Sequence, residues 1–314
     1  MLISLVGLTF GWYFFGAVGT SAGDEIFSVP QDSSGFKPSE SLKEKGLIRN
    51  AVAFQFLLDT FAKEVKIQSG GYRLNQGMTA WGVLAKIIGR PDLMWITISG
   101  CPRREQIGEK LAGIFGWESG KEAEWNTLAA SGNPDYFEGV YYPDTYLLPV
   151  DGSVAEIAKR LTDRFNEKFS PLAPQFIAAN IKWTTGLKIA SLIAREAGGA
   201  ADMRLISGVI WNRLNIGMPL QIDATMQYTL GKRADGSWWG SVDLAEKQND
   251  SPYNSYLYKG LPPTPICSPN ITMIEAALKP EETACLFYLH DRLGKIHCAE
   301  TYAEHLANIR RYLN

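Results

Sequence analysis

One stretch of the chain combines a strong helical pattern with an isolated acidic residue. Apolar side chains recur at helical spacing over residues 187–197, and Gly198-Gly199 ends that pattern. Just before this end lies Glu196, the only acidic residue within positions 168–201. The pattern therefore predicts a largely apolar helix with a single carboxyl group near its C-terminal end.

The rest of the second half also predicts helices joined by shaped loops. Thr184 and Thr185 are candidate caps for the start of the helix that holds Glu196. The segment 251–269 is rich in proline and glycine, which predicts a loop of fixed shape, and binding residues often lie on such loops. The other expected elements are helices at 154–169, 173–181 and 203–214, a short polar-apolar run at 219–228, and a hairpin of 285–290 with 295–299 around Leu293-Gly294.

The first half predicts short strands that alternate with helices. A polar connection is expected at 24–39, and the elements after it are helices at 43–66, 78–88 and 105–115 and strands at 71–77, 94–99 and 138–149.

The first residues carry no charge. Positions 2–23 contain no charged side chain, and a membrane helix needs roughly 20 apolar residues. The run therefore predicts a single-pass membrane anchor. The alternative is a cleaved signal peptide, with Thr20 and Ala22 as the small residues before the cut. The apolar run is longer than a usual signal-peptide core, which favours the anchor.

Glu196 is a candidate proton donor. Apolar surroundings disfavour the charged form of a carboxyl group and raise its pKa, and a raised pKa lets the group donate a proton near neutral pH. The alternative interpretation is a solvated glutamate at a helix end.

Four ordered blocks of the sequence resemble the endolytic murein transglycosylase family, the membrane-anchored lytic transglycosylases of bacteria. The blocks are FEGVYYPDTYLLP from residue 137, ASLIARE from 190, GVIWNRLNIGMPLQIDAT from 208 and SPYNSYLYKGLPPTPICSP from 251; IEAALKP and TYAEH near the end also match. The family commonly reads ASIVEKET where this chain reads ASLIAREA. Ala194 thus replaces one family glutamate, and Glu196 matches the catalytic one.

The resemblance implies an α+β fold in three parts. These are a transmembrane anchor at 1–23, a small mixed LysM-like membrane-proximal region at 24–150, and a helix-rich catalytic transglycosylase domain with short β elements at 151–314. The LysM-like resemblance is the weakest, because Ser99-Gly100-Cys101-Pro102 stands where the family usually has Glu-Gly after a strand. That region is either a glycan-binding module or a spacer that holds the active site away from the membrane.

The resemblance also implies a reaction and a set of site residues. A lytic transglycosylase cuts the MurNAc-GlcNAc β-1,4 bond of peptidoglycan without water and leaves 1,6-anhydro-MurNAc ends, with Glu196 acting as general acid and then as base. The candidate substrate-binding residues are Asn212, Gln221, Asp223, Thr225, Tyr228, Tyr253 and Asn254. Several of these polar groups could instead satisfy buried backbone groups.

Two alternatives stay open. Asp223 is interpreted as a loop-shaping or hydrogen-bonding residue, but as a second carboxylate facing Glu196 it would make the protein a hydrolase. A catalytically idle peptidoglycan-binding scaffold for cell-wall synthases is the other function class. The intact Glu196 favours the enzyme.

Composition and motif spacing exclude several other functions. The 314 residues carry a formal net charge of −2, which gives no support to nucleic-acid binding. No CxxC or HExxH spacing is present, so neither a metal nor another cofactor is expected. The four cysteines permit two disulfides without requiring them. The expected location is the bacterial inner membrane, with the catalytic part on the periplasmic side and with peptidoglycan strands and peptidoglycan synthases (penicillin-binding proteins) as partners.

Overall fold

The protein is a mixed α/β protein with small antiparallel sheets. The computed structural model of the protein describes residues 11–20, 23–128 and 138–313. The described chain forms two compact units, Met1–Thr97 with Thr145–Ser153, and Ile98–Asp144 with Val154–Asn314. Each unit is built from helices and short antiparallel strands, so the predicted α+β class is confirmed. Residues 98–144 belong to the second unit, and residues 145–153 return to the first.

The predicted anchor lies largely outside the described residues. Positions 1–10 and 21–22 of the run 2–23 are not described. Within residues 11–20, 23–128 and 138–313, none of the helices has the length and hydropathy needed to cross a membrane.

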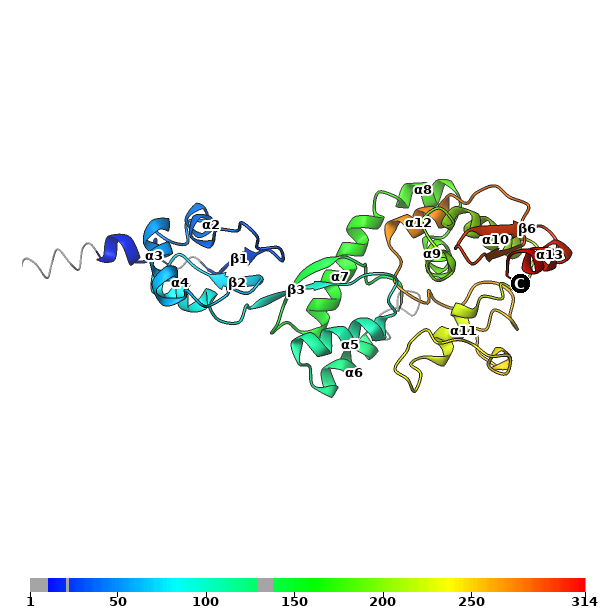
Figure 1. Cartoon of the computed structure of the whole chain (residues 1–314), viewed down its shortest axis with the longest axis horizontal. Coiled ribbons are helices and arrows are strands. Elements are labelled where there is room, and N and C mark those ends of the chain that lie inside the picture. Colours follow the sequence, from blue (N-terminus) through cyan, green and yellow to red (C-terminus); the bar gives the residue numbers. More distant parts are fainter. Residues whose placement is uncertain (1–10, 21–22, 129–137, 314) are drawn as a thin grey trace, which may run out of the picture. The chain divides into compact units, whose positions relative to one another are not determined.

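The first unit is organised by a four-stranded antiparallel sheet (Figure 1). Its strands lie in the order β1-β2-β3-β4, and β2 joins β3 through the single pair Gly71 and Leu93. Gly70 has φ of +153°, and a Cβ atom there would lie 2.5 Å from the carbonyl oxygen of Leu93. Glycine is therefore required where the two strands approach. The strands are β1 (Glu25–Val29), β2 (Gly70–Leu74), β3 (Leu93–Thr97) and β4 (Thr145–Pro149).

The helices of this unit pack with strands β1 and β2, and the structure corrects two expectations about this region. The region 24–39 was expected to be a connection, but β1 lies there because Phe27 and Val29 alternate into the core. The helix expected at 43–66 is interrupted, because Asn50 accepts a hydrogen bond from the Ala53 amide and starts a new helix. The helices of this unit are α2 (Pro38–Glu44), α3 (Ala51–Phe61) and α4 (Ala80–Ile87).

The second unit is mainly helical (Figure 1). Its helices 154–169 and 203–214 were predicted and are confirmed within one residue. The run 219–228 was not assigned a helix, yet its second part forms one. The helices are α5 (Arg104–Phe115), α6 (Ser119–Leu128), α7 (Val154–Phe169), α8 (Ala173–Ala178), α9 (Trp183–Glu196), α10 (Met203–Asn215), α11 (Asp223–Leu230), α12 (Ile271–Leu278) and α13 (Tyr302–Tyr312), with a short 3-10 turn at Glu246–Gln248.

Helix α9 forms the centre of the second unit. It contacts α10, α11 and α12, and its middle residues, including Ile189, Ala190 and Leu192, have no exposed surface. The helix begins at Trp183, with Lys182 at the N-cap position and no side-chain cap. The expectation that Thr184 or Thr185 caps it is therefore wrong, since both lie inside the first turn.

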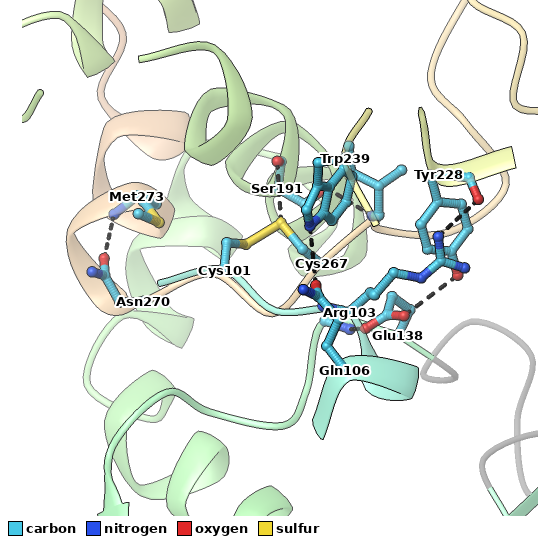
Figure 2. The surroundings of a disulfide bond; sticks show 12 residues. Cys101, Arg103, Gln106, Glu138, Ser191, Tyr228, Trp239, Cys267, Asn270 and Met273 are labelled. Atoms are coloured by element: carbon cyan, nitrogen blue, oxygen red, sulfur yellow. Dashed lines mark hydrogen bonds between the residues drawn. A yellow bond between two sulfur atoms is a disulfide. The ribbon is translucent and has the colours of Figure 1, made fainter. Parts of the chain in front are cut away.

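The predicted hairpin near the end of the chain is confirmed. It consists of β5 (Phe287–His290) and β6 (Ile296–Ala299), and α13 packs on both strands. All four cysteines form disulfides: Cys285–Cys298 bridges this hairpin, and Cys101–Cys267 joins positions 166 residues apart. The Cys101–Cys267 disulfide joins the segment before α5 to the proline-rich loop near α9 (Figure 2).

Candidate active site

Glu196 is the last residue of α9. Burial of the helix brings its half-buried carboxyl group into apolar surroundings, and this burial raises the pKa of Glu196 above its usual value. The sequence-based expectation of a carboxyl group at the end of an apolar helix therefore matches its position in the structure.

Tyr288 on β5 is the direct partner of this carboxyl group. Its phenolic Oη donates a hydrogen bond of 2.6 Å to Oε2 of Glu196. Burial and the neighbouring Glu196 carboxyl raise the pKa of Tyr288 well above its usual value, so the phenol stays protonated and remains a donor. No described residue hydrogen-bonds Oε1 of Glu196. One carboxyl oxygen is thus fixed by the protein, and the other is left for a substrate.

The β5–β6 hairpin sets the position of Tyr288. Tyr288 pairs with Cys298 across the two strands, and the Cys285–Cys298 disulfide closes the hairpin beside that pair. His290 lies two positions further along β5, on the same face of the strand. The hairpin therefore presents two polar side chains toward the end of α9.

His290 shapes the turn that follows Glu196. Its Nε2 lies 3.1 Å from Oδ2 of Asp202. A Cβ atom on Gly198 would lie 3.1 Å from the same carboxylate oxygen and 3.4 Å from the imidazole. The turn after α9 therefore passes close to this pair, and the positive charge that His290 can carry counteracts the raised pKa of Glu196.

Asp223, the first residue of α11, is held by two partners. Tyr256 donates a hydrogen bond to Oδ1, and the ammonium of Lys247 forms a 2.8 Å ion pair with the same oxygen. Lys247 also donates to the Tyr256 oxygen over 2.9 Å. No hydrogen bond joins Asp223 to Glu196 among the described residues, but the negative charge of Asp223 adds to the raised pKa of Glu196.

Arg213 links the elements that carry these groups. Its Nε donates to the Leu286 carbonyl over 2.6 Å, just before β5, and one terminal nitrogen donates to the Leu220 carbonyl over 2.5 Å, just before α11. The buried guanidinium thus ties α10 to both neighbouring segments of the site.

Three of the predicted substrate-binding residues bind the protein's own backbone. Asn212 donates to the carbonyls of Thr283 and Cys285. The buried Thr225 bonds within its own helix and to a serine, and the fully buried Asn254 bonds four backbone groups of its loop. Asn212 thus fixes the segment before β5, whereas Thr225 and Asn254 hold α11 and the loop that carries Tyr256.

Gln221 is exposed and has a positive φ of 53°, which is uncommon for a residue other than glycine. The hydrogen bond from its amide to the Ser255 carbonyl, 2.9 Å long, holds this conformation. Its side chain lies on the surface two residues before Asp223, so it remains free to contact a ligand.

The other two predicted residues, Tyr228 and Tyr253, belong to a second cluster. Their rings lie 5.0 Å apart, and Tyr228 faces the fully buried Glu138 with an oxygen-oxygen distance of 3.4 Å (Figure 2). Burial raises the pKa of Glu138 to about 8. Arg103 stacks on Tyr228 and donates to its carbonyl. None of the bonds described for these tyrosines involves Glu196.

The sequence interpretation missed several members of the site. Tyr288, His290, Asp202, Lys247 and Arg213 were not proposed, although Tyr288 and His290 show a two-residue spacing within a predicted strand.

The residues that the structure describes contain no group of three His, Cys, Asp or Glu side chains placed to hold a metal ion.

Comparisons with known proteins agree in the family that they indicate. The model of the YceG-like family matches residues 27–311. The endolytic murein transglycosylase of Bacillus subtilis is 26% identical, with 91% of this chain and 84% of that protein aligned. The protein of the same name from Streptococcus pneumoniae is 24% identical over 91% of this chain, which spans only 58% of that relative.

A solved structure has the same fold. A YceG-like protein from Listeria monocytogenes aligns with a TM-score of 0.64 and 24% identity, covering 91% of this chain and 99% of that chain.

Proposed function

Because the chain belongs to the YceG-like family, we propose that it is an endolytic peptidoglycan lytic transglycosylase with Glu196 as its general acid and base. Curated relatives that align with 91% of this chain carry the name endolytic murein transglycosylase. The enzyme cleaves the β-1,4 bond between MurNAc and GlcNAc within glycan strands.

The observation that carries the proposal is the asymmetric environment of the Glu196 carboxyl group. Tyr288 fixes Oε2, Oε1 has no described partner, and burial raises the pKa. A carboxyl group in this state delivers its proton to the glycosidic oxygen from Oε1 while Tyr288 stabilises the carboxylate that forms.

The second half of the reaction uses the same residue. When the glycosidic bond breaks, positive charge develops at the anomeric carbon of the MurNAc residue. The C6 hydroxyl of that sugar attacks this carbon, and the Glu196 carboxylate takes the hydroxyl proton. The product is a 1,6-anhydro ring, and the acid is regenerated without water.

Asp223 fits this scheme better as a support than as a second catalytic carboxylate. Tyr256 and Lys247 both bind its Oδ1, so a nucleophilic role would require breaking these contacts. Its charge instead keeps Glu196 protonated, as the acid step requires.

The test is to identify the ends that cleavage creates. Purified peptidoglycan strands should gain anhydro-muramyl ends, which mass spectrometry reads as one water less than a hydrolysed end. Glu196→Gln should lose about 10²–10⁴-fold in rate while remaining folded, and Glu282→Gln, at an exposed position, should not. Reducing-end MurNAc would mean that water attacks, and binding without any cleavage would favour a scaffold. A strong chelator in the assay should have no effect.

The location is part of the proposal. The charge-free run 2–23 supports a single-pass anchor in the bacterial inner membrane, with Asp24 onward on the periplasmic side. The two disulfides fit an oxidising compartment. A reporter that works only after export, fused after Asn314, should be active. Activity of a reporter that works only in the cytoplasm would contradict this topology, and a mature N-terminus near Ala22 would show a cleaved signal peptide.

The roles of the two parts of the chain are also part of the proposal. Residues 24–150 would form the LysM-like membrane-proximal region and residues 151–314 the catalytic domain, with peptidoglycan synthases as partners. Cross-linking in cells tests the partners: recovery of a penicillin-binding protein supports the proposal, and its absence from the cross-linked products opposes it.

A further inference from the structure

Arg195, next to Glu196 in the last turn of α9, forms no ion pair with any described residue. Its guanidinium carbon lies 4.1 Å from the ring centroid of Trp239. Its Nε is buried and has no hydrogen-bond partner, and within the described part of the chain the side chain forms neither a hydrogen bond nor an ion pair. Besides the electrostatic effect of the adjacent Glu196, its contact in the described structure is the one with Trp239.

Two other arginines of this unit, Arg103 and Arg213, have bonded guanidinium groups. Arg103 forms a 2.8 Å ion pair with Glu105, and Arg213 donates to three backbone carbonyls. Burying a charged group without hydrogen-bond partners is costly, and the burial of Arg195 lowers its pKa. Arg195 therefore differs from Arg103 and Arg213 in that its guanidinium has no hydrogen-bond partner within the described residues.

Trp239 is a fixed platform for this guanidinium. Its indole Nε1 donates to Oε1 of Gln106 on α5 over 3.0 Å (Figure 2). Its carbonyl accepts a hydrogen bond from Gln227 on α11. The same Gln106 oxygen accepts from the Arg103 amide at the start of α5. Helix α5 thus holds the ring and α11 holds the backbone of Trp239, so the stacked guanidinium is oriented before any ligand arrives.

We propose that Arg195, stacked on Trp239, binds a carboxylate group of the substrate strand beside the bond that Glu196 cleaves; this rests on the proposed function. A guanidinium offers a planar fork of donors that matches both oxygens of a carboxylate. Adjacent positions on a helix diverge by about 100°, so the two side chains reach different points of one strand. A murein strand offers two sources of this group, the free carboxylates of its peptide stems and, where a stem has been removed, the lactyl carboxylate of MurNAc.

The main competing explanation is that Arg195 acts only through Glu196. Its positive charge lowers the pKa of Glu196, so any Arg195 variant changes the catalytic acid as well. Binding should therefore be measured in the full chain carrying Glu196→Gln, where position 196 does not titrate.

The experiment compares the affinity of three soluble strand preparations: strands with intact stems, strands stripped of stems, and intact strands whose carboxylates have been converted to amides. Adding Arg195→Gln should weaken binding of a carboxylate-bearing strand by about 10-fold or more, because the hydrogen bonds between the guanidinium and the carboxylate are lost. Binding of the amidated strands should not change. Arg311→Gln removes an exposed arginine that also lies over an aromatic ring, and it should have no effect.

Comparison of the three strand preparations identifies the source of the carboxylate. A loss confined to intact strands assigns the peptide stem, a loss confined to stripped strands assigns the lactyl group, and a loss with both means that both reach Arg195. Arg195→Lys keeps the charge but not the fork and should give an intermediate loss. An equal loss with amidated strands, or no loss with any strand, would overturn the proposal.

Failure of this inference can be told apart from failure of the proposed function. If no anhydro ends appear but Arg195→Gln still selectively weakens carboxylate binding, the cleavage proposal fails and the subsite stands. If anhydro ends appear and Arg195→Gln binds every strand as well as its parent does, the subsite fails and the function stands.

Discussion

The phenolic oxygen of Tyr288 lies 2.6 Å from Oε2 of Glu196, although 92 positions separate the two residues in the chain. This bond stabilises the ionised form of the carboxyl group and so opposes the rise of its pKa that burial causes. The protein thus sets the protonation of its acid through two opposing effects, which can be changed separately by substitution.

Tyr288→Phe should move the pKa of Glu196 further upward. The variant removes the donor to the carboxylate while the burial remains, so the limb of the pH–rate profile that reports Glu196 should shift to higher pH. We expect a rate loss of about tenfold at neutral pH, since a hydrogen bond to a charged group is worth about 1.5–3 kcal/mol. Tyr302→Phe, which alters an exposed tyrosine, is the matched control. A rate loss without any shift of the limb would reduce Tyr288 to a packing residue.

Asp223→Asn should shift the same limb in the opposite direction. The charge of Asp223 raises the pKa of Glu196, so its removal should lower that pKa and move the limb to lower pH. We expect anhydro products to persist, with a rate within about tenfold of the parent. That range corresponds to about 1.4 kcal/mol. Complete loss of cleavage with a folded protein would instead support Asp223 as a second catalytic carboxylate.

Glu138 should make the protein less stable as the pH rises. Its pKa in the folded protein is about 8, above the value of about 4.3 expected in the unfolded chain. Between these pH values the folded state holds a proton that the unfolded state lacks. The contribution of protonated Glu138 to the free energy of unfolding is therefore complete below about pH 4.3 and declines as the pH rises toward 8. Glu138→Gln should flatten this dependence by up to about 1.4 kcal/mol per pH unit. Urea unfolding at several pH values measures the free energy of unfolding of both proteins. If this free energy changed with pH equally in the parent and in Glu138→Gln, the prediction would be wrong.

The two disulfides should have separable effects. Loop-closure entropy predicts about 5 kcal/mol of stabilisation for Cys101–Cys267 and about 3 kcal/mol for Cys285–Cys298, because the first closes a far longer loop. The Cys285–Cys298 disulfide also holds the hairpin that carries Tyr288. Replacing both of its cysteines by alanine should therefore reduce the activity of the folded protein, whereas replacing Cys101 and Cys267 should mainly lower the free energy of unfolding. Equal activity of both folded double variants would argue against a role of the hairpin bridge in catalysis.

Local patterns in the sequence predicted the elements that form from local signals. The helix α7 and the hairpin around Leu293-Gly294 follow from apolar spacing and turn residues, and both are confirmed. Strand β1 and the helix α11 were missed. β1 lies in a stretch that resembles a connection, and it forms a strand because it pairs antiparallel with β2, from Glu25 with Leu74 to Val29 with Gly70. Such pairing leaves no local signal.

Some residues of the candidate site likewise have a local signal in the sequence, and others have none. Glu196 was found because it is an isolated acid at the end of an apolar helix, a local feature. Its partners Tyr288 and His290 lie on a strand far along the chain, and nothing in their own surroundings marks them as neighbours of α9. Conversely, Asn212 and Asn254 have the polar chemistry of ligand-binding residues, but their amides bond carbonyls that become buried only when the loops fold.

The distance in sequence between Glu196 and the β5–β6 hairpin has a consequence for timing. The chain is synthesised from its N-terminus, so Glu196 emerges long before Tyr288, and the Cys285–Cys298 bridge needs an oxidant that is available outside the cytoplasm. Until the hairpin docks, the carboxyl group lacks its hydrogen-bond donor. In the proposed location outside the cytoplasm, this bridge closes after export, so Tyr288 is fixed against Glu196 only there.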